Sequence, residues 1–389
     1  MTQRERQLLR WIEENPLISQ QELADKAGIA RSSVAVHISN LMKKGHIAGK
    51  GYIVSTAPYA VVVGGVNMDI GGVSSAPLVP ADSNPGVVRM SLGGVGRNIA
   101  HNMALLGLDA RMLTAFGDDL YAQRIAASCG ELGIDISRSL QVPGGRTSTY
   151  LFIADEGGEM RLALSDMEIY RHITPAFLAS RAQLLQNAQL VIVDTNIPAD
   201  AIRWIAEHVT PPIFADPVST AKAQRLGPVL GKLHTLKPNR LEAELLSGVA
   251  ITDEASLNRA ADVLLDTGLR RVFISLGGDG VLAADHSGRV RLPCLPGKRV
   301  NTTGCGDAFM AALAWAYLEG TDLEGTALAG SAAASLAMES AETINEAMSV
   351  EALTARMGLQ PSPRGGDACR WQASIADRVE GETGGTAKP

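Results

Sequence analysis

From residue 60 onwards the chain alternates short apolar runs with segments of helical periodicity. The apolar runs are rich in Val, Ile and Leu, as is typical of strands that are buried on both faces. Because strands that alternate with helices pair in parallel and are covered on both sides, the pattern predicts an α/β fold, a three-layer α/β/α sandwich. The strand candidates are residues 60–63, 110–115, 190–193, 213–215, 233–236 and 272–276, and the helix candidates include residues 99–106 and 122–132.

Two stretches break this alternation. Residues 72–90, and residues 147–153 with 161–164, look like strands with no helix between them, and we expect a small extra sheet that forms a lid. Residues 361–389 are rich in Pro, Gly and charged residues and have no apolar period, so we expect a disordered tail. These boundaries assign residues 58–358 to the α/β domain.

The first 54 residues follow a different pattern, of three short helices and a strand pair. The first helix ends near Pro16, and residues 19–22 (SQQE) fit a capping box that opens the second. A third helix starts near Ser32, and residues 45–47 and 49–54 look like two short strands with a basic, glycine-rich tip. The residues predicted to face inward are Leu8, Leu9, Ile12, Val34, Ile38, Leu41 and Met42.

The charge of this first segment differs from that of the rest of the chain. Residues 1–54 carry eight Lys and Arg against five Asp and Glu, a net +3, so the formal net charge of −6 leaves −9 for the remainder. An acidic chain is unsuited to coating nucleic acid or anionic membrane along its whole length, but a basic segment suits DNA phosphates. The order of three helices followed by a strand pair, the wing, resembles the winged helix-turn-helix domain of many bacterial regulators. This resemblance implies DNA binding. A small helical interaction or dimerisation module with a basic face is the alternative. The residues expected to face DNA are Arg31, Ser33, His37, Asn40, Lys43, Lys44 and Lys50.

The strongest chemical signal is residues 301–307 (NTTGCGD), which precede a helical run at residues 308–318. Gly304 and Gly306 leave backbone N–H groups at a helix start free to converge on an anion, and the helix dipole reinforces them. Asp307, beside such a nest, is suited to accept a proton from an attacking hydroxyl. The alternative is an Asp that caps the helix, with glycines present for close packing.

A second glycine-rich helix start lies at residues 93–98 (GGVGRN). Its spacing differs from the dinucleotide fingerprint GxGxxG, and its last residue, Asn98, can hydrogen-bond a hydroxyl. Asn67 and Asp69 follow the first strand, at the end where α/β sheets bind ligands, and both suit a ribose diol.

Together these stretches resemble the ribokinase (PfkB) family of carbohydrate and nucleoside kinases, over about residues 58–358. Both family signatures are present, at residues 93–98 and 301–309, and residues 239–242 (NRLE) match the family's NxxE element. Within the family the chain is most similar to the pseudouridine kinases, through residues 81–86 (ADSNPG) and the residues that surround the other motifs. The resemblance implies a ribokinase-like fold with a β lid, and ATP-dependent phosphorylation of the 5'-hydroxyl of pseudouridine.

The family resemblance also implies a role for each matching residue. Asp307 would be the catalytic base, and Gly304, Cys305 and Gly306 would form the anion hole. The expected substrate-binding residues are Asn67, Asp69, Gly94 and Asn98, with Glu159 as a lid-side sugar contact and Ser83 and Asn84 as further candidate contacts to the lid side of the substrate. The expected cofactor-binding residues are Asn239 and Glu242, which would order Mg²⁺ and the ATP phosphates, with Ser275, Gly277, Gly278 and Gly280 in a nucleotide-binding loop.

Two positions depart from the family's pattern. Cys305 replaces an alanine, and because only its backbone N–H is needed, activity should survive. Asn301 stands where ribokinases often have an Asp that helps to bind K⁺, which weakens the expectation of K⁺ activation. Thr303 and Ser349 are further candidate oxygen donors for that monovalent cation.

The remaining features set the expected context. The four cysteines have no zinc-like spacing, the N-terminus has no apolar signal region, and no run of 18 apolar residues occurs, so we expect a cytoplasmic protein. A homodimer is expected by analogy with other winged-helix proteins and sugar kinases. Two alternatives for function stay open: a kinase for another nucleoside or a pentose, and a transcription regulator whose kinase-like domain only senses a nucleoside.

Overall fold

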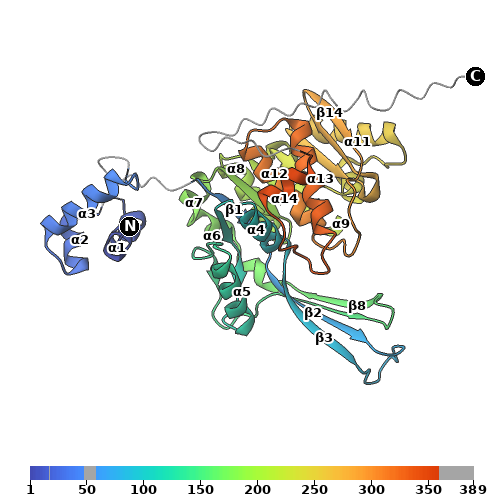
Figure 1. Ribbon diagram of the computed structural model, residues 1–389, viewed down its shortest axis with the longest axis horizontal. Coiled ribbons are helices and arrows are strands. Elements are labelled where there is room, and N and C mark those ends of the chain that lie inside the picture. Colours follow the sequence, from blue (N-terminus) through green and yellow to red (C-terminus); the bar gives the residue numbers. More distant parts are fainter. Residues whose placement is uncertain (17, 48–57, 359–389) are drawn as a thin grey trace, which may run out of the picture. The chain divides into compact units, whose positions relative to one another are not determined.

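The computed structural model describes residues 1–16, 18–47 and 58–358, and the chain divides into two compact units, Met1–Pro58 and Tyr59–Pro389 (Figure 1). The predicted strand at residues 49–54, Lys50 and the predicted tail lie outside the described residues. None of the helices in the described ranges combines the length and hydropathy that a membrane span requires.

The N-terminal unit contains three helices, α1 (Gln3–Glu14), α2 (Gln20–Ala27) and α3 (Arg31–Lys43). The capping box predicted from Ser19 and Glu22 is present at the start of α2, and the helix ends at Gly28, whose φ of +63° suits glycine. The prediction for Met42 is wrong, because this side chain is 43% exposed. The side chains that form the core of this unit are Leu8, Leu9, Ile12, Ile18, Leu23, Val34, Ile38, Leu41 and Ile47.

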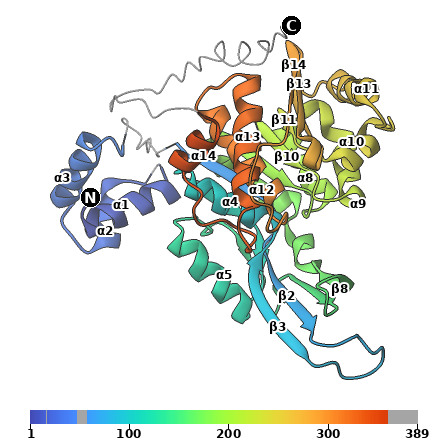
Figure 2. The ribbon, with the colours of Figure 1, turned by 45° about the vertical axis from the view of Figure 1, so that its right-hand side comes forward.

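The second unit is built on an eight-stranded sheet with the order β14-β13-β12-β11-β10-β9-β1-β4 (Figures 1 and 2). The six predicted strands are present and parallel to one another: β1 (Ala60–Val63), β4 (Ala110–Leu113), β9 (Leu190–Asp194), β10 (Ile213–Asp216), β11 (Thr235–Leu236) and β12 (Arg271–Ser275). The sequence analysis missed β13 (Val281–Asp285) and β14 (Gly288–Leu292), which extend the sheet as antiparallel strands. Antiparallel pairing follows from the short connections between these strands, since a parallel crossover needs a dozen residues or more.

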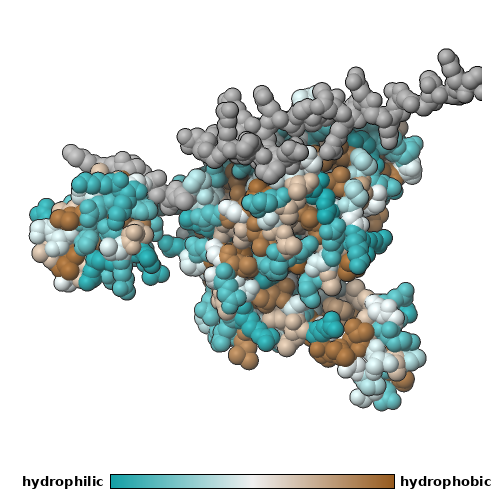
Figure 3. All heavy atoms as spheres, in the orientation of Figure 1, coloured by the Kyte–Doolittle hydropathy of each residue, from teal (hydrophilic) through white to brown (hydrophobic). Residues whose placement is uncertain are grey.

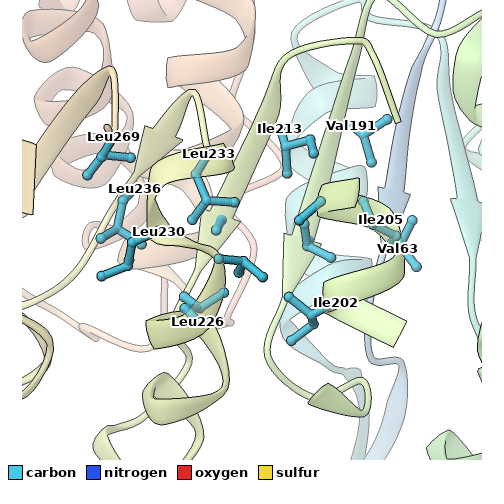
Figure 4. Close-up of a cluster of buried hydrophobic side chains, with 14 of the residues drawn as sticks. Val63, Val191, Ile202, Ile205, Ile213, Leu226, Leu230, Leu233, Leu236 and Leu269 are labelled. Carbon is cyan, nitrogen blue, oxygen red and sulfur yellow. The ribbon is translucent and has the colours of Figure 1, made fainter. Parts of the chain in front are cut away.

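Alternate residues of the central strands face two separate cores. Val61 and Val63 of β1 belong to one core, whereas Ala60 and Val62 belong to the other. The first core contains residues of α8 (Ala199–His208), α10 (Arg240–Ser247) and α11 (Glu254–Asp266), and part of it is drawn in Figure 4. The second contains residues of α4 (Val95–Leu105), α5 (Leu120–Glu131), α12 (Cys305–Leu318) and α13 (Leu323–Ala337). Helices therefore cover both faces of the sheet, as the three-layer prediction requires.

The predicted lid is a four-stranded sheet with the order β3-β2-β7-β8, and Figure 2 shows it projecting from the body. Its strands are β2 (Asn67–Ser74), β3 (Gly86–Gly93), β7 (Thr149–Ala154) and β8 (Met160–Asp166). The remaining regular elements are β5 (Ala115–Phe116), β6 (Leu140–Gln141), α6 (Pro175–Ala179), α7 (Ala182–Gln186), α9 (Thr220–Ala223), α14 (Val350–Arg356) and three short 3₁₀ segments at residues 168–172, 224–232 and 277–279.

Candidate active site

Two buried carboxylates end neighbouring central strands. Asp194 is the last residue of β9 and Asp216 the last of β10, and the two are paired in the register of the sheet. Their side chains are almost completely buried. The carboxyl ends of parallel strands are where α/β sheets bind ligands, so these residues mark the site. The sequence analysis missed both, although an Asp that ends a buried apolar run is a usable signal.

Asp194 fixes the turn that follows β1. Its Oδ2 accepts a hydrogen bond from the Gly65 N–H at 2.8 Å, and its Oδ1 accepts one from the Asn196 N–H at 2.8 Å. A Cβ at Gly64 would lie 2.4 Å from Asp194 Oδ2, so this close approach requires glycine. Burial raises the pKa of Asp194 to about 6. The role of Asp194 is to hold the backbone that leads into β2.

The two glycine-rich helix starts singled out in the sequence meet in space. Asn98 Nδ2, in the first turn of α4, donates to Asp307 Oδ2, in the first turn of α12, at 2.9 Å. Gly304 precedes α12 with φ +85°, and a Cβ there would lie 2.1 Å from the Thr343 carbonyl oxygen. The first-turn N–H groups of α12 have no partner within the helix and point out of its start. This arrangement is an anion-binding nest with a carboxylate at its edge.

Asp307 has the electrostatics of a proton acceptor. Burial and the neighbouring Asp216 and Asp194 carboxylates raise the pKa of Asp307 to about 8, against the opposing effects of the Asn98 hydrogen bond and of Lys237. A carboxylate whose pKa lies near the working pH is suited to general base catalysis.

Lys237 is a site residue that the sequence analysis did not select. It follows β11, is 6% exposed, and its Nζ lies 3.1 Å from Asp216 Oδ2. A Cβ at Gly306 would lie 3.2 Å from this same Nζ, so the ammonium group lies against the anion-binding nest. Burial alone would lower the pKa of Lys237, but Asp216, Glu242 and Asp307 outweigh it and raise the pKa. Lys237 is therefore a buried cation among several carboxylates.

The predicted sugar-binding residues Asn67, Asp69 and Gly94 lie together at the base of the lid. Asn67 Nδ2 donates to Asp69 Oδ1, and burial raises the pKa of Asp69 to about 6. A Cβ at Gly93 would lie 2.1 Å from Asp69 Oδ2, and Gly94, with φ +97°, packs on the backbone of residues 65–66. Since Gly94 precedes α4 directly, this group is continuous with Asn98 and Asp307.

Three other predicted substrate residues lie elsewhere. Asn67 pairs with Gly93 at the base of the lid sheet, whereas Glu159 directly precedes the far end of β8. The Glu159 side chain is 75% exposed and lies 3.4 Å from Arg161. Asn84 donates to the Val79 and Asp82 carbonyl oxygens within the β2–β3 connection, and Ser83 is an exposed neighbour. The structure does not bring Glu159, Ser83 and Asn84 to Asp307, because a full strand length separates them.

The predicted cofactor-binding residues lie beside Lys237. Asn239 and Glu242 form a reciprocal capping box at the start of α10, with both hydrogen bonds at 2.9 Å. The backbones of Ser275 and Asn239 pair in an isolated parallel β-bridge. The glycines Gly277, Gly278 and Gly280 form the tight turn between β12 and β13, and Gly280 packs against the backbone of residues 292–294. Burial raises the pKa of Glu242, with a further contribution from Asp216.

Two of the three candidate cation ligands, Asn301 and Ser349, use their side chains in hydrogen bonds within the chain. Ser349 Oγ accepts the Ala352 N–H as the N-cap of α14. The Asn301 side chain bonds to the backbone of Thr303 and Ala341. Thr303 is exposed and adjacent to Gly304.

The candidate DNA-binding residues fall into two groups. Arg31, Ser33 and Lys43 on α3 are exposed, and His37 and Asn40 are half-buried on the same helix. Lys44 is different, because its Nζ contacts both carboxylate oxygens of Glu5, at 3.0 and 2.7 Å, and Glu5 is 1% exposed. The hydrogen bond from Lys44 helps to lower the pKa of Glu5 to about 2. Lys44 is therefore engaged in joining α3 to α1, which the sequence analysis did not anticipate.

Known proteins resemble both units. Residues 57–349 match the pfkB family of carbohydrate kinases, and residues 1–47 match a winged helix-turn-helix DNA-binding family. The uncharacterised sugar kinase YeiI of Escherichia coli (strain K12) is 38% identical over 355 residues, which cover 90% of this chain and 98% of that protein. The pseudouridine kinase of the same organism is 39% identical over 294 residues, which cover 75% of this chain and 94% of that protein. A carbohydrate kinase structure from Agrobacterium tumefaciens superposes with a TM-score of 0.68 at 27% identity, covering 78% of this chain and 98% of the other. The chain belongs to the pfkB family of carbohydrate kinases and carries an N-terminal winged helix-turn-helix domain.

Proposed function

We propose that this sugar or nucleoside kinase transfers the γ-phosphoryl group of ATP to the 5'-hydroxyl of pseudouridine. The observation that carries the proposal is Asp307, a partly buried carboxylate of raised pKa at the edge of an anion-binding nest, hydrogen-bonded to Asn98. The choice of pseudouridine is supported by the 39% identity to a pseudouridine kinase over most of its length. Asn67 and Asp69, at the base of the lid, are the proposed contacts to the ribose hydroxyls.

In the proposed mechanism, Asp307 accepts the proton of the 5'-hydroxyl as the oxygen attacks in line. The N–H groups at the start of α12 and the Lys237 ammonium stabilise the charge on the transferred phosphoryl group. The lid excludes water, which would otherwise compete as the acceptor. These roles use the residues that the fold brings to the carboxyl ends of β9, β10 and β11.

The donor set also fits a magnesium nucleotide. The buried carboxylates of Asp216 and Glu242 lie near Lys237. Asn239, the capping partner of Glu242, is paired with Ser275, just before the glycine turn at residues 277–280. Carboxylates and phosphate oxygens are the ligands that Mg²⁺ prefers. Bound Mg²⁺ would neutralise charge on the ATP phosphates, with Glu242 as an indirect, outer ligand.

The test is a phosphorylation screen of the purified chain with ATP and Mg²⁺ against pseudouridine, uridine, inosine and ribose. We expect the highest kcat/KM with pseudouridine and a 5'-monophosphate as product, identified by mass spectrometry. Preferential turnover of another acceptor would replace the substrate assignment. Binding of pseudouridine with no turnover of any acceptor would favour the alternative, a regulator that senses the nucleoside.

We also propose that the N-terminal domain binds DNA through α3, and the two neighbouring lysines of this helix provide a test. Lys43→Gln should reduce the slope of log K against log salt by about 1 without changing the melting temperature, because Lys43 is exposed. Lys44→Gln should lower the melting temperature of the N-terminal domain, because it leaves the buried Glu5 without its cation. Both are measured on the full chain, by fluorescence anisotropy with a duplex from upstream of its gene and by calorimetry. An unchanged salt slope for Lys43→Gln would exclude this face as the interface.

The homodimer likewise remains a proposal, and the lid supports it. Four apolar side chains of the lid are each more than half exposed: Val88 and Met90 of β3, and Leu162 and Leu164 of β8. The register of the strands places all four on the same face of the lid sheet. Apolar atoms are visible on the lid in Figure 3. A second copy of the chain would remove this surface from water.

A further inference from the structure

Two loops meet beneath the anion-binding nest. The N–H groups of Val300 and Asn301 both donate to the Met338 carbonyl oxygen, at 2.8 and 3.2 Å. The Gly304 Cα lies so close to the Thr343 carbonyl oxygen that a Cβ would come within 2.1 Å of it. The segment after α13, residues 338–343, therefore supports the turn that opens α12 and sets where its N–H groups point.

The Asn301 side chain joins these two segments. Its Oδ1 accepts the Thr303 N–H at 3.0 Å, and its Nδ2 donates to the Ala341 carbonyl oxygen at 3.1 Å. The orientation of the amide follows from these partners, because a backbone N–H must donate and a carbonyl oxygen must accept. Asn301 therefore presents a hydrogen-bond donor, with partial positive charge, to the segment that follows α13.

The family resemblance implies a monovalent cation at this place, and the residues present do not fit one. Such an ion needs several oxygen ligands with free lone pairs, and often a carboxylate. Here N–H donors, with partial positive charge, are directed at Asn301 Oδ1, Ser349 Oγ, Ala341 O and Met338 O, and an amide stands at the position where a carboxylate would attract the ion. The nearby Glu339 is bonded to Arg356, with both oxygens at 3.0 Å. No cluster of three or more His, Cys, Asp or Glu suited to a metal occurs within residues 1–16, 18–47 and 58–358.

We infer that the Asn301 amide occupies the structural place of the cation, so that this kinase is independent of K⁺. Asn301 is a positioning residue: it acts on the phosphates only through Thr303 and Gly304, by holding the turn that precedes the nest. The inference rests on the proposed ATP-dependent kinase activity, and it concerns the nucleotide half of the site, whichever acceptor is used.

The first test compares cations at constant ionic strength. For the wild-type chain, kcat/KM for ATP in K⁺, Na⁺ and tetramethylammonium should agree within about twofold, since no ligand set distinguishes them.

Asn301→Asp keeps the oxygen that accepts the Thr303 N–H but places a negative charge against Ala341 O. We expect this variant to lose activity in tetramethylammonium and to regain it in K⁺ by about tenfold or more, the usual range for groups that orient ligands. Asn301→Ala, which removes both hydrogen bonds, should raise KM for ATP in every salt. Asn187→Asp, on an exposed residue, is the matched control and should show no dependence on the cation.

A second readout does not need turnover. The melting temperature with saturating Mg²⁺-ADP, measured in KCl and in tetramethylammonium chloride, should be the same for the wild type and higher in KCl for Asn301→Asp. Stimulation of wild-type kcat/KM by K⁺ of more than about fivefold would overturn the inference, as would an Asn301→Asp variant that does not respond to K⁺ in either measurement. If no acceptor is phosphorylated, the proposed function fails, but the ADP measurement still decides the inference.

Discussion

Asp307→Asn should lower kcat by at least about 100-fold while leaving the fold intact. The asparagine side chain can keep the hydrogen-bonding contact with Asn98, but it cannot accept the hydroxyl proton. Steady-state kinetics with the preferred acceptor, together with direct binding of that acceptor, separates loss of the chemical step from loss of binding. Near-normal turnover would remove Asp307 as the base.

The same substitution has a predicted sign for stability. The pKa of Asp307 is raised to about 8 by burial, so the folded chain holds this proton more tightly than the unfolded chain, whose carboxyl has its ordinary pKa of 3.8. Stability from this group is therefore lost as the pH rises from about 4 to about 8. We expect Asp307→Asn to melt at or above the wild-type temperature at pH 8, which would exclude misfolding as the cause of its inactivity. Asp322→Asn is the control, because Asp322 caps α13 outside the site and asparagine caps a helix equally well.

The raised pKa also predicts the pH dependence of the wild type. The base must be ionised to accept a proton, so kcat/KM should fall about tenfold per pH unit below the pKa of Asp307 and level off above it. In Asp307→Asn this acidic limb should disappear, whereas an unchanged limb would assign it to another group.

Local patterns were sufficient to predict most of the fold. The apolar runs at β1 and β9 alternate between two cores, and such period-two burial follows directly from strand geometry. The lid followed from two stretches that lacked intervening helices. The antiparallel strands β13 and β14 were missed because the sequence analysis treated the glycine turn at residues 277–280 only as a binding loop.

The site was less predictable, because proximity is a property of the tertiary structure. Asn98 and Asp307 could be paired through their motifs, but Lys237 and Asp216 are single residues after short strands, and only the sheet order brings them together. Glu159 stays a prediction. The family resemblance implied a lid-side sugar contact, and the register of the lid strands places Glu159 on the lid, at the end remote from Asn67. Lys44 was likewise selected for its charge, although Glu5 binds it.

Lys237 should be needed both for turnover and for stability, because it balances the negative charge of the site. Asp216, Glu242 and Asp307 all act on this ammonium group, so its removal leaves the nest facing uncompensated negative charge. Lys237→Met should lower kcat by about 100-fold or more, the range for losing one preorganised donor to a developing anion. It should also lower the free energy of unfolding by about 3 kcal/mol, because Asp216 is left buried without its cation.

A second substitution separates these two effects. In the double variant Lys237→Met with Asp216→Asn, no unpaired charge remains at this position, so most of the lost stability should return, whereas the lost kcat should not, because the phosphoryl group still lacks its cation. Urea unfolding and steady-state kinetics are measured on four proteins: the wild type, the two single variants and the double variant. Lys232→Met, at an exposed position, is the control for loss of a lysine. If activity returns together with stability, Lys237 only neutralises Asp216. If stability alone returns, and the single variant Asp216→Asn keeps a higher kcat than the double variant, the ammonium group acts on the phosphates, and the pairing with Asp216 is what holds it against Gly306.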